Sequence, residues 1–290
     1  MNRIASVQMN CKNGKFDENL SKILGCIDEA CDHGAELAVL PEGIYQGYCF
    51  DTYEEIFPLA EEIPNGKFTQ TLMKKAKERN TYIIAGLYEK EGIKLYNSAV
   101  FVGPDGYVGT YRKMHYFCTE KAFCEPSYSG FPVFDTRLGR IGIMICYDLW
   151  FPETMRLLTL QGADLICSPA GWVMNDTKEK IMKNPGNYNM PLENALCISA
   201  SKCNSLYIAA AARVGEERGT KWTGYSLITA PSGEVLSSAD GEHEKILYAD
   251  VDLRRAKEYR QSGSRNNLFS DRRTDFYDEM LGLDAKRYIQ

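Results

Sequence analysis

Apolar and polar positions alternate along this chain with two different periods. Residues 3–9 and 37–40 are short, mostly apolar runs, which are typical of buried strands. Residues 17–33 and 66–79 instead carry apolar side chains three or four positions apart, which predicts amphipathic helices. Residues 82–87 predict a further strand. Because strands and helices alternate in this way, we expect an α/β fold.

The second half of the chain repeats landmarks of the first half in the same order. The matched segments are residues 3–5 with 140–142, 33–43 with 161–171, 80–85 with 204–209, and 104–106 with 231–233. α/β proteins use similar glycine and proline punctuation without any repeat, but four landmarks in register favour an internal repeat. We therefore expect two similar halves joined near residue 135, with two sheets packed face to face and helices outside them.

The two halves are not separated by a linker rich in glycine, serine or proline, so we expect one domain over residues 1–290. From Asp250 onward, charged residues of both signs alternate and apolar residues become sparse. This composition predicts that residues 252–290 form a C-terminal arm, which lies across the body or against a neighbouring subunit. A solvated surface is the simpler alternative for a run of mixed charge.

Composition and charge exclude several kinds of partner. The chain holds 34 Lys and Arg against 39 Asp and Glu, and the resulting net charge of −5 gives no general attraction to nucleic acid or to an anionic membrane. The longest apolar runs, such as residues 206–212, have the length of strands and are too short to cross a bilayer. Residues 1–12 lack the apolar core of a signal peptide. We expect a cytoplasmic protein with a small-molecule partner.

Ten cysteines need an explanation, and a reducing compartment would keep them as thiols. Structural zinc sites use close cysteine pairs, because two ligands must reach one ion from a tight turn. The nearest pairs along this chain are wider, namely Cys26 with Cys31, Cys118 with Cys124, and Cys197 with Cys203. With three histidines in addition, we expect neither a metal site nor another cofactor. Most of the cysteines are expected to be small buried side chains.

Cys146 has the most suggestive position of the ten. An apolar run over residues 139–145 ends at this cysteine, and a helix is predicted to begin at Pro152. Sites in α/β proteins lie beyond the carboxyl ends of strands, and the positive end of a helix dipole favours a thiolate. Cys146 is thus placed as a nucleophile would be, although a small buried residue would fit the same pattern.

A nucleophilic thiol needs a base or a cation nearby, and two segments offer candidates. Residues 111–120 bring together cations, the imidazole of His115 and a carboxylate, although a strand end with a solvated basic pair would look the same. Glu42 follows the apolar run 37–40, whereas its counterpart in the second half is Ala170. A charged residue at the end of a buried strand is poorly explained by packing, so Glu42 is the second candidate.

Several separated motifs resemble the nitrilase or carbon-nitrogen hydrolase superfamily over nearly the whole chain. They are, in order, residues 4–9, Leu40-Pro41-Glu42, residues 111–115, residues 145–148 and Asp271-Arg272-Arg273. The resemblance implies a four-layer α-β-β-α sandwich, in agreement with the two predicted halves. It also implies a catalytic triad of glutamate, lysine and cysteine, and dimerisation through helices near the nucleophile. We therefore expect a homodimer or a higher homo-oligomer.

Matched residue by residue, the resemblance implies a role for each candidate. Cys146 corresponds to the nucleophile, Glu42 to the general base, and Lys113 to the cation that stabilises the tetrahedral intermediate. Glu120 corresponds to a second glutamate that positions substrate and lysine, and the backbone N–H of Tyr147 would add an oxyanion donor. In physical terms, Lys113 would lower the pKa of the Cys146 thiol, while two carboxylates in one pocket would hold a proton on one of them.

The resemblance also indicates a branch of the family. Residues 146–153 are more similar to the amidases and N-carbamoyl amidohydrolases than to true nitrilases. Carbamoylases that act on amino acids carry arginine where this chain has Leu149 and Trp150, so a substrate carboxylate beside the reacting carbon is not expected. The expected reaction is hydrolysis of a small amide or N-carbamoyl amine through a Cys146 thioester, with release of ammonia. A nitrilase or an acyl transferase is the alternative, and a non-catalytic sensor or scaffold is a further one.

The walls of the pocket can be predicted from neighbouring residues in the sequence. Tyr48, Trp150 and Trp172 lie close to the matched residues along the chain, and aromatic walls would suit an apolar or aromatic acyl group. Core or interface positions are the alternative for all three. His115 is expected to be a hydrogen-bonded structural residue and not the base.

Overall fold

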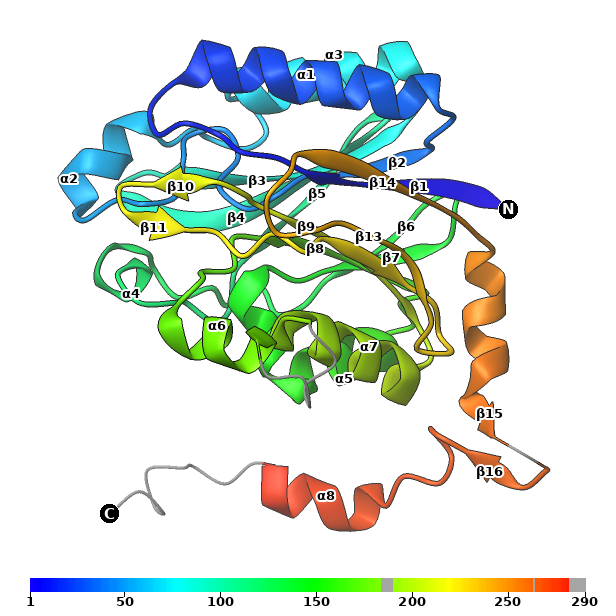
Figure 1. The fold of residues 1–290 in the computed structure, drawn as a ribbon. Coiled ribbons are helices and arrows are strands. Elements are labelled where there is room, and N and C mark those ends of the chain that lie inside the picture. The colour runs from blue at the N-terminus through cyan, green and yellow to red at the C-terminus, as the bar shows by residue number, and fades with distance from the viewer. Residues whose placement is uncertain (184–189, 263, 282–290) are drawn as a thin grey trace, which may run out of the picture.

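Two six-stranded sheets packed face to face form the centre of the structure, which is a computed structural model describing residues 1–183, 190–262 and 264–281 (Figure 1). The strands of the first sheet, in spatial order, are β14 (Lys245–Val251), β1 (Asn2–Gln8), β2 (Leu37–Val39), β3 (Tyr82–Glu91), β4 (Lys94–Gly103) and β5 (Gly106–Arg112). Those of the second sheet are β13 (Val235–Ser238), β12 (Leu227–Thr229), β9 (Tyr207–Ala212), β8 (Leu165–Ala170), β7 (Arg140–Ile143) and β6 (Val133–Asp135). Two short ribbons, β10 (Glu216–Glu217) with β11 (Thr220–Lys221) and β15 (Gln261–Ser262) with β16 (Asn266–Asn267), lie outside these sheets.

Helices cover the outer face of each sheet (Figure 1). On the first sheet lie α1 (Phe16–Asp32) and α3 (Lys67–Arg79), and on the second lie α5 (Pro152–Leu160), α6 (Asp176–Lys183) and α7 (Leu192–Asn204). Shorter helices are α2 (Tyr53–Ile56), η1 (Phe57–Leu59), α4 (Glu120–Phe123) and η2 (Cys146–Trp150). The layers therefore run helix, sheet, sheet, helix, as the sequence predicted.

The two sheets have the same topology. In the first, β1, β2 and β3 are parallel and β4 and β5 follow as an antiparallel hairpin. In the second, β7, β8 and β9 are parallel and β12 and β13 follow in the same way. Each sheet is completed by an antiparallel strand beside its first parallel strand, β14 in one and β6 in the other. The predicted internal repeat, with its junction near residue 135, is confirmed.

Successive side chains of β3 point alternately to the two faces of the first sheet. Tyr82 and Ile84 pack into the core between the sheets, whereas Ile83, Ala85 and Leu87 pack into the cluster formed with α1 and α3. Strand β3 is longer than the predicted strand 82–87, because it pairs with β4 as far as Glu91 and Lys94. Its polar end interrupts the apolar pattern but not the hydrogen-bonded ladder.

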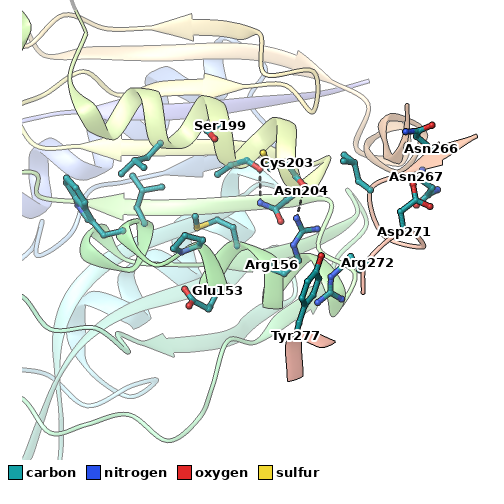
Figure 2. A pocket seen from close by; sticks show the side chains of 17 residues that line it. Glu153, Arg156, Ser199, Cys203, Asn204, Asn266, Asn267, Asp271, Arg272 and Tyr277 are labelled. Atoms are coloured by element: carbon teal, nitrogen blue, oxygen red, sulfur yellow. Dashed lines mark hydrogen bonds between the residues drawn. The ribbon is translucent and has the colours of Figure 1, made fainter. Parts of the chain in front are cut away.

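The chain after β14 leaves the sheets and runs past the helices of the second half (Figure 1). It contains η3 (Leu253–Arg260), the β15–β16 ribbon and α8 (Thr274–Leu281). A groove of about 820 Å³ lies between this segment and α5 and α7, as Figure 2 shows. The predicted arm 252–290 also includes residues 263 and 282–290, which lie outside the described residues. None of the described helices is both long and apolar enough to span a membrane.

Candidate active site

Four ionisable side chains meet beyond the carboxyl ends of the strands. Glu42 follows β2, Lys113 directly follows β5, Glu120 is the first residue of α4, and Cys146 is the first residue of η2. Cys146 is the most exposed of the four, with 5% of its surface accessible. Because charged groups are almost never buried to this extent without a partner, the cluster must satisfy its own charges.

The position of Glu42 depends on Gly86 in the neighbouring strand β3. A β-carbon at position 86 would lie 2.5 Å from the Cα atom of Glu42, so glycine is what allows the turn after β2 to pass this close. The Gly86 N–H donates to the carbonyl oxygen of Pro41 over 3.1 Å and ties the turn to β3. Gly43 continues the turn with a positive φ of 55°.

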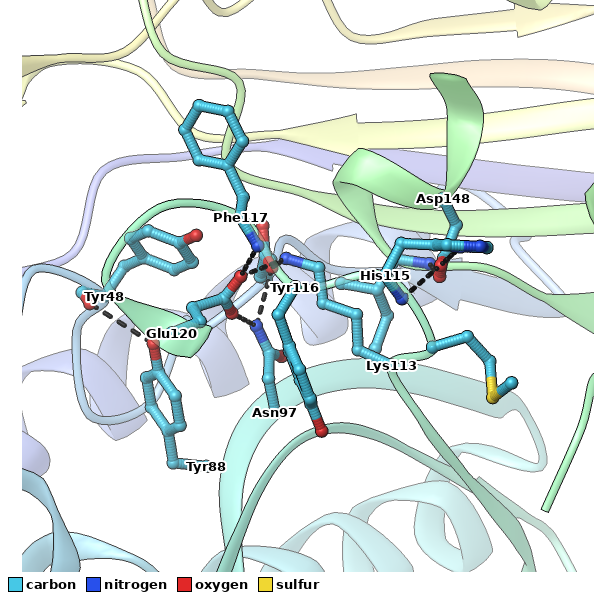
Figure 3. A network of polar contacts seen from close by, with 12 residues as sticks. Tyr48, Tyr88, Asn97, Lys113, His115, Tyr116, Phe117, Glu120 and Asp148 are labelled. Carbon is cyan, nitrogen blue, oxygen red and sulfur yellow. Dashed lines mark hydrogen bonds and ion pairs between the residues drawn. The ribbon is translucent and has the colours of Figure 1, made fainter. Parts of the chain in front are cut away.

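Lys113 bridges the two carboxylates. Its Nζ atom lies 2.7 Å from Oε1 of Glu42 and 2.7 Å from Oε2 of Glu120, and all three side chains are at most 1% exposed. Figure 3 shows the Lys113 side chain directed toward Glu120. The Glu120 carboxylate is also held by a residue close to it in the sequence, because the N–H of Phe117 donates to Glu120 Oε2 over 2.8 Å. The predicted glutamate–lysine–glutamate cluster is thus assembled from three separate segments.

Burial and charge act on the acidity of this cluster in opposite directions. Burial raises the pKa of Glu42, and the nearby Glu120 carboxylate raises it further, whereas Lys113 lowers it; the net shift is upward. Burial by itself would lower the pKa of Lys113, but the carboxylates of Glu120 and Glu42 outweigh it and hold this pKa well above its usual value. Lys113 therefore stays protonated, and Glu42 binds a proton more readily than an exposed glutamate does.

Cys146 occupies a strained turn between β7 and the helix that begins at Pro152. Its φ of 47° lies in the left-handed region, which non-glycine residues adopt infrequently. Burial and the Glu42 carboxylate raise the pKa of its thiol well above the usual value, although Lys113 and the backbone N–H of Gly171 both act to lower it. The expected lowering by Lys113 is therefore present but outweighed, and Cys146 rests as a protonated thiol.

Asp148 locks this turn to the segment after β5. Its buried carboxylate accepts from the Ile145 N–H over 2.8 Å and from the Tyr111 hydroxyl over 2.7 Å. It also pairs with His115, whose Nδ1 lies 2.7 Å from Asp148 Oδ1 (Figure 3). The His115 ring stacks on Phe151 with centroids 3.7 Å apart. This geometry agrees with a structural role for His115, as expected from the sequence.

Tyr48 reaches the cluster from the loop after β2. The Nζ atom of Lys113 lies 5.8 Å from the centroid of the Tyr48 ring, and the Tyr48 hydroxyl is buried without a hydrogen-bond partner in the described part of the chain. Glu217 holds this loop by accepting from the Tyr48 N–H over 2.8 Å, and Glu217 is itself paired with the fully buried Arg213. Glu217 therefore fixes the Tyr48 backbone, while the Tyr48 ring lies beside Lys113.

The other three predicted aromatic residues, Tyr147, Trp172 and Trp150, differ in how deeply they are buried. The Tyr147 side chain is half-buried between Phe117 and Phe151, with ring centroids 5.3 Å from each. Trp172 is 2% exposed and directly follows Gly171, beside Cys146. Trp150 does not join the cluster: 40% of its surface is exposed, and it lines the outer groove of Figure 2. The turn of η2 that buries Cys146 directs Trp150 outward.

Sequence reasoning missed three residues that shape this site, namely Asn97, Asp148 and Gly171. Asn97 lies on β4, and its Nδ2 donates to Oε1 of Glu42 over 2.7 Å and also to Oε1 of Glu120. A signal was available, because Asn97 and Ser98 interrupt the otherwise apolar run 95–102. Among residues 1–183, 190–262 and 264–281, no group of three or more His, Cys, Asp or Glu is arranged to hold a metal ion.

A buried cysteine, two glutamates and a lysine lie together at the strand ends of the α-β-β-α sandwich, and comparison with known proteins shows which family the chain belongs to. The carbon-nitrogen hydrolase family model matches residues 3–261. The chain is 44% identical to a nitrilase of Pyrococcus abyssi, over 96% of this chain and 99% of that protein. It is 34% identical to an omega-amidase of Bos taurus, over 98% of both chains.

A solved structure extends the similarity to three dimensions. The carbon-nitrogen hydrolase from Helicobacter pylori G27 superposes with a TM-score of 0.84 at 26% identity, covering 97% of this chain and 98% of that one. The chain therefore belongs to the carbon-nitrogen hydrolase family and is an enzyme of the amidase and nitrilase type.

Proposed function

We propose that this enzyme hydrolyses a small amide or N-carbamoyl amine through a thioester on Cys146, with Glu42 as general base. The observation that carries the proposal is the arrangement at Gly171. The Gly171 N–H donates to the Cys146 sulfur, and the same glycine lies against Oε2 of Glu42, an atom with no hydrogen-bond partner among the described residues. An unpaired carboxylate oxygen beside a protonated thiol is what a general base for that thiol requires.

In the first half-reaction the Cys146 sulfur attacks the carbonyl carbon while its proton passes to Glu42 Oε2. The carbonyl oxygen becomes an oxyanion, stabilised by the Lys113 ammonium and by the Tyr147 N–H. The intermediate then collapses: the carbon–nitrogen bond breaks, the nitrogen takes the proton from Glu42, and ammonia leaves. Glu120 has a positioning role, because it holds the Lys113 ammonium through an ion pair of 2.7 Å.

In the second half-reaction water attacks the thioester and gives its proton to Glu42. The carbon–sulfur bond breaks, and the Cys146 sulfur recovers a proton from Glu42 as the acid product leaves. An N-carbamoyl substrate would leave a thiocarbamate at this stage, whose hydrolysis gives carbon dioxide and an amine. Because the cycle needs a free thiol, we propose that the enzyme works in the reducing cytoplasm.

The surroundings of Cys146 favour a small substrate without a carboxylate beside the reacting carbon. Leu149 is 1% exposed and belongs to the hydrophobic core, and both Leu149 and Trp150 line the outer groove, so neither position offers a cation near the thiol. A nitrile would react with the same thiol to give a thioimidate, and an acyl transferase would replace water in the second half-reaction. The similarity to a nitrilase keeps the first of these as the second candidate.

A substrate panel with a matched pair of cysteine variants tests the proposal. Small amides, N-carbamoyl amines and nitriles are incubated with the enzyme, ammonia is measured, and the covalent adduct is sought by intact mass. Cys146→Ala is expected to abolish ammonia release and the adduct with the fold intact. Cys167→Ala removes another fully buried thiol, from β8, and is expected to keep the activity. Ammonia release by Cys146→Ala at the wild-type rate would refute the mechanism.

We also propose that the enzyme forms a homodimer or a higher homo-oligomer through α5 and α7. Leu157 and Leu160 of α5 are 46% and 47% exposed, and with Trp150 they expose apolar surface near the groove of Figure 2. Family resemblance supports the same helices. Light scattering after gel filtration is expected to give at least twice the mass of one chain for the wild type, and a smaller mass for a Leu157→Glu/Leu160→Glu variant. A monomeric wild type at micromolar concentration would refute this proposal.

A further inference from the structure

The Asn97 side chain forms hydrogen bonds with both glutamates of the cluster. It lies on β4, in the first sheet, and is 1% exposed. Its amide nitrogen carries two hydrogens, and these go to Oε1 of Glu42, at 2.7 Å, and to Oε1 of Glu120. Figure 3 shows the Asn97 amide directed toward Glu120. The Asn97 backbone carbonyl also accepts from the Lys113 N–H over 2.8 Å. Asn97 therefore contacts Glu42, Glu120 and Lys113, the three cluster residues other than Cys146.

The contacts of Asn97 and Lys113 together form a closed ring. Lys113 joins Glu42 Oε1 to Glu120 Oε2, and Asn97 joins Glu42 Oε1 to Glu120 Oε1. Two buried carboxylates with a single ammonium between them carry an excess negative charge and repel each other. Asn97 supplies two more donors without adding charge, so it holds both carboxylates in place while leaving one of them free to exchange a proton.

The ring also distinguishes the two oxygens of Glu42. Oε1 accepts from both Asn97 and Lys113, whereas Oε2 has no partner in the part of the chain that the structure describes. A β-carbon at Gly171 would lie 3.2 Å from Oε2, and the Gly171 N–H points to the Cys146 sulfur. With Oε1 occupied by donors, a proton taken up by Glu42 has Oε2 as its acceptor.

We infer that Asn97 is a positioning residue of the reaction, which occupies Glu42 Oε1 and so directs proton exchange to Oε2, the oxygen on the Cys146 side. The inference rests on the proposed function, because it presumes that Glu42 is the base. The inference adds a reason why Oε2 of Glu42, and not Oε1, exchanges the proton, and it explains how the Glu42 and Glu120 carboxylates are held in place beside each other.

The orientation of the Asn97 amide follows from its neighbours. Rotating the amide by half a turn would place its carbonyl oxygen against two carboxylate oxygens, which is repulsive. In the observed orientation Oδ1 is buried without a partner among the described side chains and backbone. A leucine of similar size would fill the space without burying an unpaired oxygen, so packing alone does not account for an asparagine at this position.

The test compares Asn97→Leu with a matched control on the same strand. Ser98→Ala removes a buried hydrogen bond of 2.6 Å to the Glu89 carboxylate on the opposite face of β4. Two rates are followed against pH: ammonia release from the amide that wild type hydrolyses, and alkylation of Cys146 by acrylamide, measured by intact mass. Asn97→Ser, which keeps a single donor, serves as a second variant should Asn97→Leu fold poorly.

Asn97→Leu is expected to lower kcat by about tenfold or more with little change in KM, since a misplaced base slows chemistry and not binding. The acid limb of both pH profiles is expected to move to higher pH, because a carboxylate that loses a hydrogen-bond donor holds its proton more tightly. Ser98→Ala is expected to lower the melting temperature without moving either limb.

Two different results would separate this inference from the proposed function. Wild-type kcat and wild-type pH profiles in Asn97→Leu and Asn97→Ser, with Cys146→Ala inactive, would overturn the role of Asn97 and leave the thiol mechanism standing. Ammonia release by Cys146→Ala would instead overturn the proposed function and this inference with it. A shifted acid limb in Asn97→Leu but not in Ser98→Ala supports both.

Discussion

Gly171 lies so close to Glu42 that a β-carbon at position 171 would be 3.2 Å from Glu42 Oε2, the oxygen we assign as the base. The same β-carbon would also lie 3.4 Å from the Trp222 ring and 3.6 Å from the Arg213 side chain, so it could not move away freely. Strand β8 thus brings a glycine to the point where proton transfer is proposed, one residue beyond its last strand position.

Gly171→Ala is expected to lower kcat/KM by about tenfold or more, since it displaces the base by a fraction of an ångström. Gly25→Ala, in α1, is the control, because no atom lies within 4 Å of its added β-carbon. That variant is expected to keep full activity and to gain about 0.4–1 kcal/mol in free energy of unfolding. Kinetics on both variants check the prediction, and equal activities would contradict it.

Lys113→Met is expected to cost about 3–5 kcal/mol in free energy of unfolding at neutral pH, because it leaves two buried carboxylates without their cation. The deficit should shrink as the pH falls and the carboxylates take up protons. Glu42→Gln keeps Lys113 paired with Glu120 and is expected to cost about 1 kcal/mol or less. Urea unfolding at pH 5 and pH 8 measures these differences; equal costs for the two variants would exclude a charge-balancing role for Lys113.

Both the activity and the stability of this enzyme should depend on pH through Glu42. Burial raises the pKa of its carboxyl above the ordinary value of 4.5, so the ionised, active base appears at higher pH than for an exposed glutamate. Since the folded pKa is raised, this group contributes stability below pH 4.5 and loses it as the pH rises through the folded value. Relative to Glu42→Gln, the wild type should therefore lose stability as the pH rises over this interval. A constant difference would argue against the raised pKa.

His115→Ala is expected to keep kcat within about threefold of the wild type, because the ring contacts Asp148 and Phe151 and not the thiol. It should cost about 1–2 kcal/mol in stability for the lost hydrogen bond and stacking. Asp148→Asn is the more severe change, since an amide nitrogen would replace one carboxylate oxygen that accepts from donors. Loss of activity in His115→Ala equal to that in Cys146→Ala would point to a cysteine–histidine pair instead.

Much of the fold could be predicted because its signals are local. The helix expected at 17–33 is observed as Phe16–Asp32, and the helix expected at 66–79 is observed as Lys67–Arg79. Periodic apolar positions are read from a few neighbouring residues, and the internal repeat supplies a second copy of the same signals. The end of β3 could not be predicted in this way, since its polar residues are held by pairing with β4.

The candidate site also has features that local sequence predicts and features that depend on tertiary contacts. Sequence alone named the residues that we propose as the reactive groups, Cys146, Glu42, Lys113 and Glu120, because each lies in a short motif that can be recognised from residue type and order. Tertiary structure decided how those groups are coupled. Asn97 joins the two glutamates, burial outweighs Lys113 at the thiol, and Trp150 faces outward. These outcomes depend on distances and solvent exclusion between segments far apart in the chain, which no local pattern encodes.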